Sequence, residues 1–292
     1  MTVIDEALPQ AGPLPVEPGK GPNQLHGLVD QLAWIGRFVV FATKTFVNIP
    51  FVAVRHRNEV YRLIADVTFG GGIMAVAAST VLVVFVIAAF VGITIGLEGY
   101  QGLQIIGLAP LAGYLSSYAN TREIAPLITA FGLAAQMGCK FTTQLGAMRI
   151  NDEIDALEVM GIRSLPYLVT TRLMAALVVV TPLYLVALSG AYLATQITVI
   201  LVAHQGGGTY THYFHAFLTA KDVLFSMTKV WVFVVLITVL HCYYGYGVSG
   251  GPEDVGRAAG RAIRASIVII ALSDMLMTLA FWGTSSGIRF SG

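Results

Sequence analysis

Long runs of apolar residues, separated by shorter polar segments, are the dominant pattern of this chain. Three runs contain no Asp, Glu, Lys or Arg: Val67 to Leu97, Leu173 to Ala203 and Val230 to Gly247. Each reaches or exceeds the roughly 18 residues that favour a membrane-spanning helix. The pattern therefore predicts at least three spans.

Two further apolar runs each contain one ionisable residue. Ile124 to Met148 contains Lys140, and Ala265 to Ile288 contains Asp274. A charge at membrane depth costs at least about 2.5 kcal/mol. We expect Lys140 to extend toward the polar segment that follows it. Asp274 is expected to form a hydrogen bond or ion pair inside the bundle, with a proton-relay role as the alternative. The pattern as a whole predicts an all-α integral membrane protein with five spans.

A short acidic helix is predicted between the second and third spans. Asn151 or Asp152 can cap its start, and Gly161 can adopt the left-handed backbone that ends it. Pro166 then prevents the helix from continuing. These signals predict a helix of about nine residues.

This acidic helix has two chemically different faces. Ile150, Ile154 and Leu157 recur at helical spacing and share one face. The carboxylates point elsewhere: Asp152, Asp155 and Glu158. The helix can therefore rest on lipid or protein and offer carboxylates to the basic side chains of a soluble partner. A solvated acidic turn is the alternative interpretation.

The chain begins with two segments of different character. Residues 1–24 are rich in proline and lack the basic and apolar regions of a signal peptide, which predicts a disordered cytoplasmic tail. Residues 25–66 interleave aromatic side chains with Arg and Lys. Such a mixture favours an interfacial or re-entrant amphipathic helix held at the lipid head groups.

Composition and charge agree with the membrane assignment. Apolar residues make up 56% of the chain and charged residues 11%, with a mean hydropathy of +0.75, far from the roughly 25% charged residues of soluble domains. Cations collect before the first span, between the second and third, and between the fourth and fifth. The positive-inside rule then places the N-terminus in the cytoplasm and the C-terminus outside. The opposite connections are expected to carry Arg122, Lys221 and Lys229.

No motif of nucleotide binding or hydrolysis is found in the sequence. Gly19-Lys20 lacks the spaced glycine and the following hydroxyl of a phosphate-binding loop. We therefore expect no catalytic residue and no directly bound cofactor. The segment 205–229 contains His212 and His215, with His204 just before it, and is interpreted as a surface loop rather than as a metal site.

Gly92 and Gly96 form a Gly-x-x-x-Gly pair late in the first span. Small residues at this spacing let two helices approach closely. The partner helix can belong to this chain or to a second subunit.

Four short motifs, in order along the chain, resemble the MlaE/YrbE permease family. They are Gly96 to Tyr100, Arg122 to Pro126, Gln144 to Met148 and Asp155 to Gly161. The resemblance implies a permease domain over residues 67–292 and a place in the cell inner membrane. It also implies the membrane subunit of an ABC-type lipid transporter.

The resemblance further implies the partners of this subunit. They are a cytoplasmic ABC ATPase dimer that uses ATP and Mg, MCE-domain proteins on the outer side, a second permease and a lipid substrate, with no nucleic acid. The acidic helix matches the coupling helix of the family, whose expected ATPase contacts are Asp152, Glu153, Asp155, Leu157 and Glu158. The expected lipid-binding residues are Phe90, Ile93, Leu97, Glu98, Tyr100, Arg122 and Glu123. Arg122 and Glu123 are expected to pair with each other in one state and to receive a lipid head group in another, with a permanent salt bridge at the span ends as the alternative.

Three places depart from the pattern of the homodimeric bacterial members: Ala135 to Gly138, Thr143 to Gly146 and Asp152 to Ile154. The altered polar groups suit a heterodimer with a second YrbE-type permease. The resemblance is then to the B-type permease of an actinobacterial, mycobacterial-type Mce system. The cargo, whether fatty acid, mycolate, phospholipid or sterol, and the direction of transport stay open.

Two functions of other classes remain as alternatives. A proton-coupled lipid carrier would need a titratable group within the membrane, and Asp274 is the candidate. An acyl-transfer enzyme would need a reactive pair such as His241 and Cys242. Neighbours on a helix point about 100° apart, which makes this pair a poor one.

Overall fold

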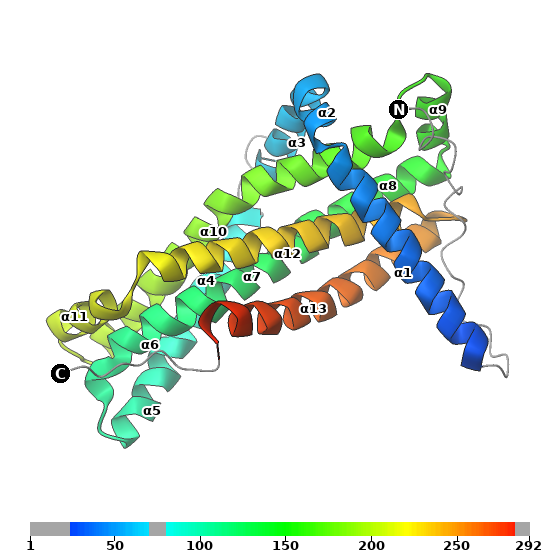
Figure 1. The fold of residues 1–292 in the computed structure, drawn as a ribbon. Coiled ribbons are helices and arrows are strands. Elements are labelled where there is room, and N and C mark those ends of the chain that lie inside the picture. Colours follow the sequence, from blue (N-terminus) through cyan, green and yellow to red (C-terminus); the bar gives the residue numbers. More distant parts are fainter. Residues whose placement is uncertain (1–23, 70–79, 284–292) are drawn as a thin grey trace. The chain divides into compact units, whose positions relative to one another are not determined.

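The computed structural model describes residues 24–69 and 80–283 (Figure 1), and within these ranges all regular structure is helical. This confirms the predicted all-α class. The proposed tail lies outside the described residues, apart from residue 24. The predicted starting region of the first span from residue 70 to 79, and the end of the fifth beyond residue 283, also lie outside them.

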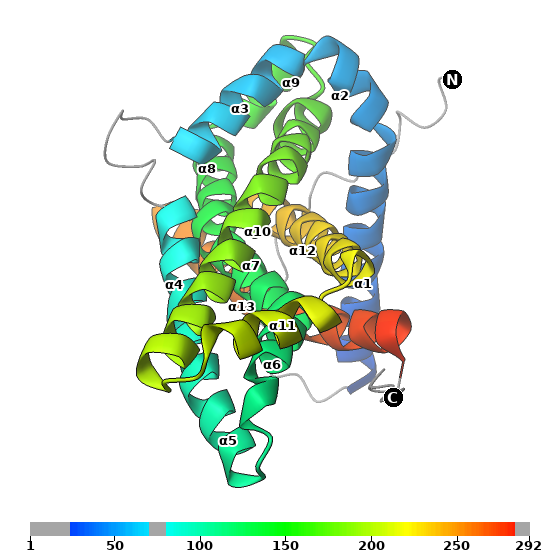
Figure 2. The ribbon, with the colours of Figure 1, turned by 90° about the vertical axis from the view of Figure 1, so that its left-hand side faces the viewer.

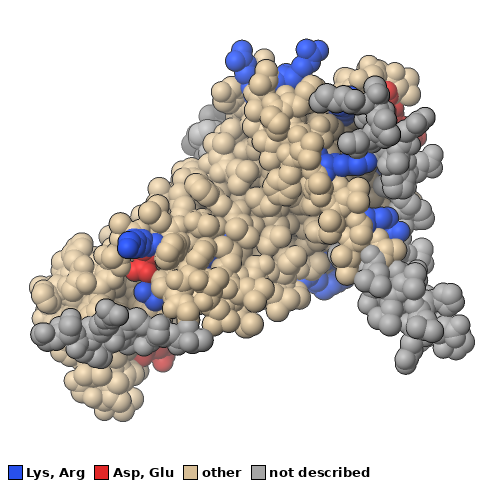
Figure 3. All heavy atoms as spheres, viewed as in Figure 1, with Lys and Arg blue, Asp and Glu red and all other residues tan. Residues whose placement is uncertain are grey.

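Five helical runs are long and apolar enough to cross a membrane, as predicted. They are Thr80–Ile105, Ala109–Ile150, Pro166–Val202, Ala220–Tyr246 and Pro252–Trp282. Figure 3 shows few charged atoms on the visible face, as a chain with 11% charged residues requires.

Each run is built from the following elements. The first contains α4 (Thr80–Thr94), η1 (Ile95–Gly99) and α5 (Tyr100–Ile105). The second contains η2 (Ala109–Leu111), α6 (Ala112–Ala119), η3 (Asn120–Ile124), α7 (Ala125–Leu133), η4 (Ala134–Gly138) and α8 (Cys139–Ile150). The third contains η5 (Pro166–Thr170), α10 (Thr171–Ile197) and η6 (Thr198–Val202), and the last two are α12 (Ala220–Tyr246) and α13 (Pro252–Trp282).

The helices extend beyond the boundaries predicted from charge. Arg122 lies inside the second run, and Lys221 and Lys229 lie inside the fourth, so none of the three belongs to a connection as predicted. The segment expected to be a surface loop contains the helix α11 (Gly207–Phe217). The second run has 42 residues, or about 63 Å of helix against a hydrocarbon core of about 30 Å. Its charged residues can therefore sit within a continuous helix and still pair with neighbours.

The chain divides into two compact units. The first comprises the chain up to Leu63 together with Ala134–Ala175 and Ile237–Ser266. It contains α1 (Gln24–Val47) and α2 (Ile49–Arg55), which are bent by 42° at Asn48, and the start of α3 (Arg57–Phe69).

The N-terminal helices of the first unit pack on its spans. Thr170 Oγ1 donates a hydrogen bond to the Thr45 carbonyl at 3.1 Å. The rings of Phe38 and Phe41 each lie 5.4 Å from the ring of Tyr243. The segment expected to be one interfacial helix is thus three helices, and its position at the lipid interface stays a prediction.

The second unit comprises Ile64–Leu133, Ala176–Leu236 and the chain from Ile267 onward. Within it α11 lies against α6 (Figure 2). Tyr210 of α11 donates a hydrogen bond to Ser116 Oγ at 2.8 Å. Tyr210 packs with Ala112 and Val199 in a small apolar core.

The glycine pair of the first span also acts within this unit. A Cβ atom at Gly92 would lie 2.5 Å from the Ala191 carbonyl oxygen, and one at Gly96 would lie 2.9 Å from Thr198 Cβ. The close crossing is therefore made with α10 and η6 of the same chain. The alternative, a second subunit on this face, is wrong because the face is already occupied.

Candidate functional site

A π-helical turn, η3, carries two of the predicted site residues in the second unit. Arg122 and Glu123 lie between α6 and α7, where the turn contains one residue more than an α-helical turn and changes the direction of the side chains. Both side chains are partly buried, with 16% and 34% of their surface exposed. They meet α12 and α13 in a group that we call the charged cluster: Arg122, Glu123, Asp222, Lys229 and Asp274, with Thr278 and Trp282.

Lys229 lies at the centre of this cluster and has no exposed side-chain surface. Its Nζ donates to the Arg122 carbonyl at 2.8 Å and to Thr278 Oγ1 at 2.9 Å. It also contacts Glu123 Oε2 at 3.3 Å and Asp274 Oδ1 at 2.6 Å. The predicted ion pair of Asp274 within the bundle is thereby confirmed.

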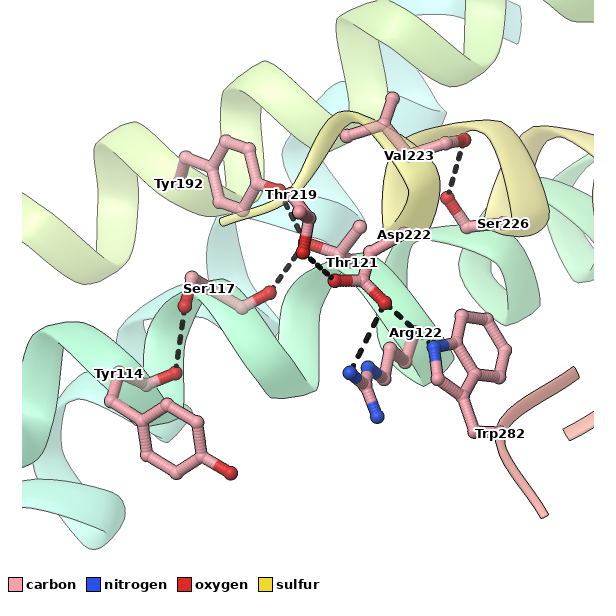
Figure 4. A network of polar contacts seen from close by, with 10 residues as sticks. All are labelled: Tyr114, Ser117, Thr121, Arg122, Tyr192, Thr219, Asp222, Val223, Ser226 and Trp282. Atoms are coloured by element: carbon pink, nitrogen blue, oxygen red, sulfur yellow. Dashed lines mark hydrogen bonds and ion pairs between the residues drawn. The ribbon is translucent and has the colours of Figure 1, made fainter. Parts of the chain in front are cut away.

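Arg122 forms a separate ion pair on the other side of the cluster. Its Nη2 lies 3.1 Å from Asp222 Oδ1, which also accepts a hydrogen bond from the Trp282 indole at 2.6 Å (Figure 4). The guanidinium lies over the rings of Tyr118 and Trp282, at 4.3 and 5.0 Å from their centres. These contacts satisfy a cation that would otherwise be costly at this depth.

Arg122 and Glu123 do not pair with each other in this structure, because each has a partner on α12. A permanent salt bridge between them is therefore wrong, and pairing in another state stays a prediction. Asp222, Lys229, Thr278 and Trp282 were missed as site residues. Lys229 directly precedes an uncharged run, and further apolar residues stand before it, from Val223 to Phe225. These preceding residues are the signal that would have placed Lys229 inside a helix.

The other predicted lipid-binding residues lie on α4, η1 and α5. Phe90 and Ile93 expose 69% and 40% of their surface, whereas Leu97 is half-buried. They form an apolar exposed side of the first span. Glu98 is exposed, and Tyr100 packs on the Tyr210 core. No described hydrogen bond or ion pair joins these two residues to the charged cluster.

The short acidic helix, α9 (Glu153–Val159), has seven residues rather than about nine. Asp152 occupies the N-cap position with a positive φ of 57°, and its side chain makes no capping hydrogen bond. Gly161 has φ of 76° and ends the helix in the left-handed conformation, as predicted. Pro166 begins the next helix, η5. The sharp turns at both ends hold α9 between the second and third spans.

The two faces of α9 separate as the sequence predicts. Ile154 is fully buried, while Val159 at the end of the helix has 89% of its surface exposed. Leu157 is half-buried, and Asp152, Glu153, Asp155 and Glu158 are exposed. An apolar anchor therefore leaves the acidic face accessible.

Two polar contacts connect the acidic face to the adjoining spans. Arg149 Nη1 of α8 lies 2.6 Å from Asp155 Oδ1. Ser164 donates to Glu158 Oε1 and lies 2.7 Å from the hydroxyl of Tyr246 at the end of α12. These contacts connect α9 to α8 and to the end of α12.

His241 does not form a reactive pair with Cys242. Its ring nitrogens lie 2.8 Å from Thr142 Oγ1 and 3.4 Å from Ser266 Oγ, and both His241 and Cys242 are buried. These contacts indicate a structural histidine that connects α8, α12 and α13 within the first unit. Across residues 24–69 and 80–283, no three His, Cys, Asp or Glu side chains are grouped to hold a metal ion.

Comparison with known proteins assigns the family. Residues 69–280 match the family model described as Permease MlaE. The chain belongs to the MlaE permease family. The chain is 26% identical to a probable ABC transporter permease protein of Rickettsia bellii. The 193 aligned residues make up 66% of this chain and 74% of the relative.

Two other relatives have more specific names. The intermembrane phospholipid transport system permease protein MlaE of Haemophilus influenzae is 23% identical over 204 residues, or 69% of this chain and 78% of the relative. The protein trigalactosyldiacylglycerol 1, chloroplastic, of Arabidopsis thaliana is 27% identical over 205 residues, or 67% of this chain and 56% of the relative. This member of the family is thus a multi-pass membrane subunit of the ABC permease type and not itself an enzyme.

Proposed function

We propose that the chain is the permease subunit of an ABC-type Mce lipid transporter. It moves a hydrophobic lipid across or out of the inner membrane, using ATP that a separate ATPase dimer hydrolyses. The observation that carries this proposal is the placement of α9, which presents exposed carboxylates while Ile154 anchors it. Coupling to a soluble motor requires such a helix, because force applied at the surface must reach the spans.

The contacts of α9 support this coupling role. The Arg149–Asp155 ion pair joins the helix to the second span, and the Glu158–Ser164–Tyr246 contacts join it to the segment just before the third span and to the fourth span. Glu153 is exposed and lies in the first turn of α9, so it is the clearest acid for an ATPase contact. Basic side chains on the motor would complement it.

The lipid cargo is supported by two kinds of observation. The first span exposes apolar side chains at Phe90 and Ile93, which suit an acyl chain or a sterol. The names of the Haemophilus influenzae and Arabidopsis thaliana relatives contain lipid classes, phospholipid and trigalactosyldiacylglycerol. These relatives favour a lipid substrate without naming the one carried here.

We further propose that the active permease is a heterodimer with a second YrbE-type permease, as in actinobacterial Mce systems, and that MCE-domain proteins receive or deliver the lipid outside. The heterodimer is supported by the three segments that depart from the pattern of the homodimeric members. By the resemblance, Gln144 stands where the homodimeric members have Glu, and its Oε1 accepts a hydrogen bond of 3.4 Å from Arg172. We propose that the second permease keeps the Glu.

The experiment that tests the proposal is charge reversal on α9 in the reconstituted transporter. Glu153→Lys is expected to lower lipid-stimulated ATP hydrolysis at least tenfold while the amount of folded permease is unchanged, because a surface acid is replaced. The matched control is Glu253→Lys, which reverses an acid with 79% side-chain exposure at the start of α13. Equal activity of the Glu153 variant and the unchanged protein would remove α9 from the ATPase interface.

The same preparation separates this function from a proton-coupled carrier. The carrier would move lipid when a proton gradient is imposed in the absence of ATP. Lipid movement that requires the ATPase subunit and ATP, and that proceeds without a gradient, is the outcome expected here. Gradient-driven movement without the ATPase would reject the proposal.

A further inference from the structure

The charged cluster contains three carboxyl groups and two cationic side chains. Asp222 is matched by Arg122 at 3.1 Å. Glu123 and Asp274 are then left to share Lys229. With all five groups ionised the cluster would carry a net negative charge inside an apolar helical bundle, which is costly.

Among the described contacts, no third cationic side chain from a neighbouring helix balances the third carboxyl group of the cluster. The titratable and charged groups that face the cluster are Arg122 and Glu123 of η3, Asp222 and Lys229 of α12, Asp274 of α13, Tyr114 and Tyr118 of α6, and Tyr192 of α10. The three tyrosines are neutral at physiological pH.

Lys229 has fewer hydrogens than acceptors. An ammonium group has three N–H donors. The Arg122 carbonyl and Thr278 Oγ1 account for two of them. Asp274 Oδ1 at 2.6 Å and Glu123 Oε2 at 3.3 Å then compete for the third.

The two carboxyl groups that share Lys229 are also close to each other. Because Glu123 Oε2 and Asp274 Oδ1 both contact the same nitrogen, they are less than about 6 Å apart, where like charges disfavour ionisation of both. Lys229 has no exposed side-chain surface and Asp274 only 11%, so water reaches the pair mainly from the side of Glu123 and screens the repulsion only in part.

We propose that Glu123 and Asp274 hold one proton between them, which makes the charged cluster electrically neutral. The proton belongs to the pair rather than to one residue. It supplies a donor where the cluster lacks one. Thr278 completes the arrangement, because its hydroxyl accepts from Lys229 and donates to Glu123 Oε1 at 2.8 Å.

This site makes the packing of α13 on η3 depend on a proton. Loss of the proton would place two carboxylates against one ammonium and push Asp274 of α13 away from Glu123. The Glu123 side chain, with 34% of its surface exposed, gives the proton a route to and from the surroundings. The inference goes beyond the proposed transport function, and it holds or fails without an ATPase or a lipid.

The test is infrared spectroscopy of the full-length chain in lipid nanodiscs at neutral pH, where exposed carboxyl groups are ionised. We expect the C=O stretch of one protonated carboxyl group, shifted on transfer to deuterated water. Glu123→Gln and Asp274→Asn should each abolish it, because a single remaining carboxylate is matched by Lys229. Glu253→Gln, which changes an exposed acid, should leave it unchanged.

Lys229→Met is expected to strengthen the protonated-carboxyl band, whereas the two amide variants remove it. This variant therefore still tests the proposal if one amide variant fails to fold. With the ammonium removed, both carboxyl groups should be protonated, and the band should double. The absence of a protonated-carboxyl band from the unchanged protein would overturn the proposal. A band that survives in both the Glu123 and Asp274 variants would also overturn it.

Discussion

The acidic helix α9 and the charged cluster both rely on ion pairs, but they are built in opposite ways. Asp155 of α9 and its partner Arg149 of α8 are six positions apart, and 55% and 26% of their side-chain surfaces are exposed. In the cluster, Lys229 is fully buried and is 106 positions from Glu123. Local, solvated charges present a surface to a partner, whereas distant, buried charges connect helices to one another.

This difference in exposure predicts how much each ion pair contributes to the stability of the folded chain. Water screens the α9 pair, so its charges remain available to an outside partner at little energetic cost. The cluster is screened less, because Lys229 is fully buried and Glu123 and Asp274 both depend on it. Removing one member of the cluster should therefore cost far more than removing one member of the α9 pair.

The largest effect is expected for Lys229→Met. It leaves Glu123 and Asp274 without their shared cation, and breaking a buried ion pair in this way typically costs about 3–5 kcal/mol. Protonation of the freed carboxyls should reduce part of that loss. The free energy of unfolding, measured by titrating the solubilised chain with a denaturing detergent, checks it. Lys221→Met is the matched control, since Lys221 is exposed on the same helix.

An intermediate effect is expected for Ile154→Ala. Ile154 is the fully buried anchor of α9, and truncation of a buried isoleucine costs about 2–5 kcal/mol. Because α9 is a short surface helix, we expect the loss as local opening, seen as faster amide hydrogen exchange over Glu153–Val159. Val159→Ala, at a position with 89% exposure, should leave the exchange unchanged. Equal exchange in the two variants would show that Ile154 does not anchor the helix.

The smallest effect is expected for Arg149→Met. The pair with Asp155 is partly exposed, and such pairs contribute less than about 1 kcal/mol. The same detergent titration measures it beside Lys229→Met. If the two variants lost equal stability, the contrast between local and distant ion pairs would be wrong.

Much of the fold could be predicted from the sequence, because the signals are local. Five spans follow from uninterrupted apolar runs, and α9 follows from its helical spacing and from Gly161. The errors occurred where a charge was taken as the end of a span. Arg122 and Lys229 continue their helices because partners from other parts of the chain compensate their charge.

The candidate site was predicted only in part. Arg122 and Glu123 were selected by resemblance, but Asp222, Lys229 and Thr278 were not. Asp274 was recognised as a buried acid, yet its partner could not be identified, since no spacing along the chain connects it to Lys229 or Glu123.

The sequence by itself determined the membrane class, the number of spans and the two faces of α9, because burial in lipid and helix periodicity act over neighbouring residues. Only the tertiary structure decided which charges meet. The Thr278–Glu123 hydrogen bond joins residues 155 positions apart, and the glycines at 92 and 96 contact α10 of the same chain. The physical reason is that a buried charge is stabilised by whichever groups the packed helices bring to it, and helix packing is set by contacts distant in the sequence.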